Sequence, residues 1–91
     1  MNDLGENNMK FQEVVHKRIF DIKKKKGWTD ADLVRFSGLS KSTVSTLKNN
    51  SHQIPSFPVL GKILCAYQMR LSEFFDCELF EENGAIKEYE Y

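Results

Sequence analysis

The strongest constraint on the fold is a pair of short amphipathic segments that meet at Gly38. Val44 and Leu47, in the second segment, lie three residues apart, which is the spacing of one helix face. Gly38 falls where the chain must leave the first segment, a position that usually needs a positive φ and favours a residue without Cβ. Ser40 can begin the second helix by accepting a backbone hydrogen bond from its first turn. Residues 30–48 are therefore predicted to form a helix-turn-helix.

The solvent face of the second predicted helix carries short hydrogen-bonding side chains with basic residues at its ends. These residues are Lys41, Ser42, Ser45, Thr46 and Lys48. Such side chains can approach the base edges and phosphates of a DNA major groove. Many helical hairpins carry the same pattern on an ordinary solvated face, so this stretch alone leaves both interpretations open.

Length and composition predict one globular domain. The chain has 91 residues, 41% of them hydrophobic, which suits a single small core. No apolar run approaches the ~20 residues that span a bilayer, and the polar N-terminus has no signal-peptide pattern. We therefore expect a cytoplasmic protein that makes no membrane contact. Cys65 and Cys77 lack the close pairing of metal or redox motifs, so we expect reduced thiols, no metal site and no cofactor.

Charge is distributed unevenly along the chain, although 13 basic residues balance 13 acidic ones. Residues 10–62 contain eleven Lys and Arg against four Asp and Glu, whereas the remainder contains two basic residues and nine acidic ones. The basic part includes the predicted helix-turn-helix. This asymmetry suits a domain that touches phosphates with one face and keeps its acidic end away from them.

Residues 1–8 are expected to form a disordered N-terminal segment, residues 9–80 the helix-turn-helix domain, and residues 81–91 an acidic C-terminal tail. Apolar spacing and capping residues predict helices at 9–26, 30–37, about 41–49, 57–68 and 71–80.

Capping residues and apolar stripes give these helices expected ends and inner faces. Thr29 and Ser56 are expected N-caps. The apolar stripe of the fourth helix consists of Phe57, Leu60, Ile63, Leu64 and Tyr67, and the fifth helix is expected to close the core with Leu71, Phe74, Phe75 and Leu79. Gly61 lies inside the fourth helix, where it is considered as a point of close helix contact.

From about residue 15 to residue 80 the chain resembles the lambda-repressor and Cro-like DNA-binding domains, also called the xenobiotic-response-element type of helix-turn-helix. The resemblance is carried, in this order, by Gly27-Trp28-Thr29, Leu33, Gly38-Leu39-Ser40, Ser42-Thr43-Val44-Ser45, Leu47, Ile54-Pro55-Ser56 and Leu71-Ser72-Glu73-Phe74-Phe75. It implies an all-α, compact five-helix lambda-repressor-like domain with the helix-turn-helix at helices two and three.

In that family the third helix lies in the major groove with its N-terminal residues on base edges. The matching base-reading residues here are Lys41, Ser42, Ser45 and Thr46. Asn49 resembles a phosphate-contacting residue, and we add Thr43, Lys48 and His52 as candidate phosphate contacts. Thr43 could instead support the helix start, and His52 could be a solvated loop residue.

The chain departs from the family pattern at four positions. Val34 stands where a small Ala is usual, so the two helices of the hairpin are expected to lie slightly farther apart. Asp30 stands where the family often has a Gln that contacts a phosphate, so that contact is expected to be lost. Asp30 is expected to favour its own helix N-terminus instead. Gln68 replaces a common Gly after the fourth helix, and Arg70 replaces the usual Ser cap of the fifth.

We therefore expect a sequence-specific regulator of transcription, most simply a repressor, that binds double-stranded DNA. The alternative is a protein-interaction module of the same fold, such as an antitoxin or an antirepressor partner, with weak or lost DNA binding. Asp30, the zero net charge and the acidic, aromatic C-terminal region motivate that alternative. An enzyme is not expected, because His16 and His52 have no nearby cysteines or paired carboxylates at catalytic or metal spacing. His16 is expected to be a boundary residue of its helix.

A domain of this size rarely reads enough base pairs alone, so a homodimer on a palindromic site is expected. The candidate dimer contacts are the aromatic residues Phe75, Phe80, Tyr89 and Tyr91. A protein partner could also bind through this C-terminal region.

Overall fold

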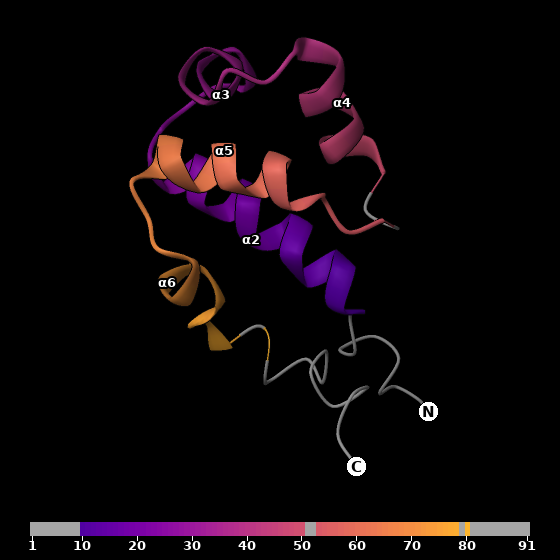
Figure 1. The fold of residues 1–91 in the computed structure, drawn as a ribbon, viewed down its shortest axis with the longest axis vertical. Helices are drawn as coiled ribbons and strands as arrows, with labels where there is room; N and C mark the ends of the chain where they lie inside the picture. The colour runs from indigo at the N-terminus through magenta and orange to yellow at the C-terminus, as the bar shows by residue number, and fades with distance from the viewer. Residues whose placement is uncertain (1–9, 51–52, 79, 81–91) are drawn as a thin grey trace.

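The computed structural model describes residues 10–50, 53–78 and 80. Within these residues it has five helices and no strand: α2 (Phe11–Lys25), α3 (Asp30–Ser37), α4 (Lys41–Asn49), α5 (Phe57–Tyr67) and α6 (Leu71–Phe75). In Figure 1, α3 and α4 lie at one end, α5 and α2 cross in the middle, and α6 lies at the opposite end. The arrangement confirms the predicted all-α class with the helix-turn-helix at the second and third helices of the domain.

Local capping explains where these helices begin. The Thr29 hydroxyl accepts a hydrogen bond from Asp32 N–H at 3.1 Å, and the Asp32 carboxylate accepts one from Thr29 N–H at 2.9 Å. Ser40 accepts a hydrogen bond from Thr43 N–H at 3.1 Å, and Ser56 begins α5 in the same way. These contacts satisfy N–H groups that have no partner inside the helix. All three N-caps agree with the sequence prediction.

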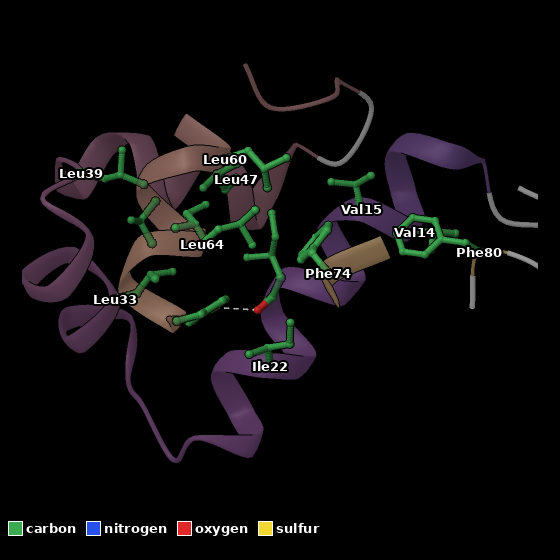
Figure 2. Close-up of a cluster of buried hydrophobic side chains, with 14 residues drawn as sticks. Val14, Val15, Ile22, Leu33, Leu39, Leu47, Leu60, Leu64, Phe74 and Phe80 are labelled. Carbon is green, nitrogen blue, oxygen red and sulfur yellow. Dashed lines mark hydrogen bonds between the residues drawn. The ribbon is translucent and has the colours of Figure 1, made fainter. Parts of the chain in front are cut away.

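The core is formed by apolar side chains from all five helices (Figure 2). Its buried members are Val14, Val15, Ile19, Ile22, Leu33, Leu39, Val44, Leu47, Leu60, Ile63, Leu64, Tyr67, Phe74 and Phe80. The Tyr67 hydroxyl donates a 2.7 Å hydrogen bond to the carbonyl oxygen of Ile19, which is the dashed line in Figure 2. Burial raises the pKa of this phenol, because the charged form would lose its hydration. The hydroxyl therefore stays protonated and joins α5 to α2.

Two apolar residues expected in the core lie on the surface instead. Phe57 is 80% exposed at the start of α5, and Leu71 is also exposed. The prediction of burial was wrong for both, because each is the first residue of its helix and its side chain lies outside the layer where the helices meet. Leu79 lies outside the described residues.

The last helix is shorter than the predicted 71–80 segment, because α6 ends at Phe75. Arg18 of α2 donates hydrogen bonds from Nε to Phe74 O at 2.9 Å and from Nη2 to Glu73 O at 3.1 Å. The guanidinium thereby binds two backbone carbonyls that would accept hydrogen bonds within the helix if α6 continued. The helical conformation is interrupted at Asp76 and Cys77, returns at Glu78 and Phe80, and Phe80 is buried in the core. The other helices match their predicted bounds within two residues.

The two family positions that differ near α6 still form a tight connection. Gln68 adopts a left-handed conformation with φ of 56°, which glycine would adopt without strain. Arg70 provides no side-chain cap, but its N–H donates a 2.7 Å hydrogen bond to the Glu73 carboxylate. The connection therefore tolerates both substitutions.

Two glycines provide a matched test of the turn. Gly38 has a φ of +80°, whereas Gly61 is helical, and a Cβ at either position would meet no atom within 4 Å. The close helix contact considered for Gly61 is therefore not formed.

Gly38→Ala should lower the free energy of unfolding by about 1–2 kcal/mol through backbone strain alone. Gly61→Ala should raise it by about 0.5–1 kcal/mol. Urea unfolding of both variants checks this, and equal effects would contradict the assigned turn conformation.

Candidate nucleic-acid interface

Helix α4 is anchored by one face and presents the other to solvent. Val44 and Leu47 are buried in the core. The four candidate base-reading residues are exposed: Lys41, Ser42, Ser45 and Thr46. Hollows flank the helix on both sides, one between α3 and α4 and the other between α4 and the segment that leads into α5. Helix α4 is therefore a ridge whose polar side chains could enter a groove of a partner molecule.

Hydroxyl groups fix the N-terminal turn of α4. Ser40 Oγ donates a hydrogen bond to Thr43 Oγ1 at 2.9 Å and lies 3.1 Å from Ser42 Oγ. Thr43 is half-buried and belongs to this capping network. The arrangement shows that Thr43 supports the helix start. A phosphate contact by Thr43 stays a prediction.

The C-terminal turn of α4 carries two of the candidate phosphate contacts. Asn49 is exposed, and its side-chain amide donates a 3.2 Å hydrogen bond to Ser45 Oγ. Lys48 lies on the same turn and its ammonium is 3.0 Å from the Asp30 carboxylate. His52 lies outside the described residues.

The Asp30 carboxylate bridges two lysines from different helices. Its Oδ1 lies 2.8 Å from the ammonium of Lys23 in α2, and its Oδ2 lies 3.0 Å from that of Lys48. Hydrogen bonds from Lys23 and then Lys48 lower the pKa of this carboxyl group. The sequence marks Asp30 as unusual at its position but does not reveal either lysine as its partner, because Lys23 and Lys48 belong to other helices and only packing brings them to the carboxylate.

The buried His16 side chain of α2 contacts the backbone at the C-terminal end of α4. Its Nδ1 lies 2.8 Å from Leu47 O and its Nε2 lies 2.6 Å from Gln53 O. A neutral imidazole donates to one of these carbonyls, and an imidazolium donates to both. The expectation of a boundary residue was wrong, since His16 is only 5% exposed. Its position next to Val15 and three residues before Ile19, both on the apolar stripe, was the signal for burial.

The aromatic residues proposed for a dimer contact pack within the chain where the structure describes them. The Phe75 and Phe80 rings lie 6.0 Å and 5.7 Å from the Phe11 ring. Phe80 is 2% exposed and Phe75 is half-buried, so Phe75 retains more surface for a second subunit. Tyr89 and Tyr91 lie outside the described residues.

Among residues 10–50, 53–78 and 80, the helices are too short or too polar to cross a bilayer. The same residues contain no group of three His, Cys, Asp or Glu side chains arranged to hold a metal ion. Cys65 and Cys77 are both free thiols.

The His16 contacts predict a specific loss of stability. His16→Leu places an apolar side chain of similar size at this position but removes the ring nitrogens that contact the Leu47 and Gln53 carbonyls. The free energy of unfolding should fall by about 1–3 kcal/mol, because the buried Leu47 carbonyl loses this partner and retains its desolvation cost. The Asn50 amide, which donates to Thr46 O at the end of α4, should also exchange its hydrogen faster. Lys17→Ala, an exposed change on the same helix, is the control.

The Asp30 bridge predicts that the free energy of unfolding depends on pH, and a comparison of wild type with Asp30→Asn isolates its contribution. Because the folded-state pKa of Asp30 lies below its ordinary 3.8, the bridge stabilises fully above about pH 4. Its contribution is lost as the pH falls through the folded-state pKa. The difference in unfolding free energy between wild type and Asp30→Asn should therefore be constant near neutrality and shrink in acid. Asp32, whose pKa is also lowered, chiefly by the Thr29 N–H, occurs in both proteins and cancels. A difference that grows in acid would contradict the bridge.

Comparison with known proteins agrees with this geometry. The HTH-type transcriptional regulator SlrR of Bacillus subtilis is 36% identical over 56 residues, which make up 62% of this chain and 37% of SlrR. The chain therefore matches well under half of that relative's length. No solved structure matches the chain at the same level of significance.

A family model described as the Cro/C1-type HTH DNA-binding domain matches residues 18–79, which include every helix from α3 to α6. The family consists of DNA-binding domains and is not a family of enzymes. The match confirms the resemblance found in the sequence. This chain belongs to the Cro/C1-type helix-turn-helix family of DNA-binding domains.

Proposed function

We propose that this protein binds a specific sequence of double-stranded DNA and regulates transcription, with α4 placed in the major groove. The observation that carries the proposal is the division of α4 into a buried anchor and an exposed polar face within a Cro/C1-type domain. An α-helix fits the width of the major groove, where each base pair presents a distinct set of donors and acceptors.

The side chains of the exposed face suit different tasks. Lys41, at the first turn of α4, has the length and donors to reach O6 and N7 of a guanine. Ser42 and Ser45 offer short hydroxyls, and Thr46 offers either its hydroxyl or its methyl group to a base. Hydrogen bonds to phosphates would fix the register of the helix without reading sequence. We assign that role to Thr43, Lys48, Asn49 and His52.

The regulatory part of the proposal is supported by the similarity to SlrR, which is described as a transcriptional regulator. Repression is its simplest form, because a bound domain blocks access to overlapping DNA. Such a protein acts where the chromosome is accessible, so we place it in the cytoplasm. We propose a homodimer on a palindromic site, with Phe75 as the described contact that retains surface.

Selection from a random duplex library at moderate salt tests the function. A single enriched motif, with two related halves if the protein binds as a dimer, is the expected result. Lys41→Ala should then weaken binding to that motif by about 1–3 kcal/mol and relax preference at one base pair. Lys17→Ala removes a lysine paired with Asp21 within α2 and serves as the charge control.

Failure to enrich any sequence would overturn the proposal. A stable complex between the protein and a co-expressed partner, together with the absence of a DNA footprint, would favour the protein-interaction module instead.

A further inference from the structure

We infer that Asp30 is a specificity-determining residue, which restrains the Lys48 ammonium at the DNA-facing surface and thereby weakens non-specific binding more than specific binding. This inference rests on the proposed function. It assigns a role to the position at which the sequence departs most clearly from its family.

The bridge connects three helices. Asp30 is the first residue of α3, and its carboxylate contacts Lys23 of α2 and Lys48 of α4. The Lys23 side chain is only 17% exposed, and its ammonium also donates a 3.5 Å hydrogen bond to Trp28 O, whereas the Lys48 side chain is 58% exposed. Lys23 therefore anchors the carboxylate, and the carboxylate in turn orients a lysine at the solvent surface.

The bridge also complements the other contacts that hold α4. The N-terminal end of the helix is fixed by the Ser40 cap, and the opposite end by His16 on Leu47 O. Asp30 holds the C-terminal turn from the side of α3. Because base contacts depend on helix position to a fraction of an ångström, this tether favours the specific complex.

The tether favours the specific complex, whereas the negative charge of Asp30 disfavours contacts with phosphates. Asp30 lines the hollow between α3 and α4 together with Lys41, Ser45, Lys48 and Asn49. A carboxylate at this place repels a phosphate and competes with it for the Lys48 ammonium. Non-specific binding consists almost wholly of phosphate contacts, whereas specific binding adds base contacts. The carboxylate should therefore disfavour non-specific complexes most.

A double-mutant cycle with Asp30→Asn and Lys48→Gln tests the inference. Each protein is titrated with the selected duplex and with a scrambled duplex of equal length, over a series of salt concentrations. Asp30→Asn should bind the scrambled duplex about five- to tenfold more tightly. The slope of the logarithm of the binding constant against the logarithm of the salt concentration should also be steeper by about 0.9, which corresponds to one additional phosphate contact. Affinity for the selected duplex should rise less, so that the ratio of the two affinities falls at least about threefold.

The coupling between the two residues is the second readout. Lys48→Gln should weaken binding to either duplex more in the Asp30→Asn background than in wild type, by about threefold or more, since the lysine is then free to contact a phosphate. Asp21→Asn removes a carboxylate that pairs with Lys17 within α2 and controls for the change in net charge. It should leave the ratio of affinities unchanged.

Two results would overturn the inference: an unchanged ratio of affinities in Asp30→Asn, or equal losses for Lys48→Gln in both backgrounds. Circular dichroism establishes that each variant folds, and Asp30→Ser, a second neutral replacement at the first residue of α3, is used where Asp30→Asn does not fold. A wild-type protein that shows no preference for any sequence would overturn the proposed function. The scrambled duplex would still measure the coupling between Asp30 and Lys48 in that case.

Discussion

The position of α4 depends on the burial of Val44 and Leu47, because a helix of nine residues is too short to be stable by itself in water. Packing of its apolar face supplies the stability that its own hydrogen bonds lack. The Ser40 cap and the His16 contact to Leu47 O then satisfy polar groups at its two ends. The exposed polar face therefore exists only while the core is intact, which links the stability of the domain to its proposed recognition of DNA.

The charged residues around α4 are the second feature that determines the properties of its exposed face. The segment from α2 to α5 is strongly basic although the whole chain is neutral. Asp30 and Asp32 are the two acidic residues of α3, and Asp32 belongs to the capping box with Thr29. Asp30 instead joins lysines from the helices on either side. An acidic residue at this position is thus compatible with a nucleic-acid interface, because it orders a lysine as well as repelling phosphate.

Sequence reasoning succeeded where a local interaction decides the structure. Thr29, Ser40 and Ser56 are N-caps, and Gly38 has the positive φ expected of it, because each depends on atoms within three or four residues. It failed where distant contacts decide. Phe57 belongs by spacing to an apolar stripe but is exposed, and α6 ends early where Arg18 takes up its last carbonyls. The base-contact and phosphate-contact assignments are proposals that rest on position along α4.

The amino-acid sequence by itself determined the all-α class, the order of the helices, the helix-turn-helix at 30–48 and the side chains available on α4. Helical spacing, capping and glycine conformation act over a few residues, so they can be recognised in the chain. Only the tertiary structure decided that His16 is buried beneath α4 and that Asp30 binds Lys23 and Lys48. Those contacts join residues up to 37 positions apart, and their existence depends on how the helices pack.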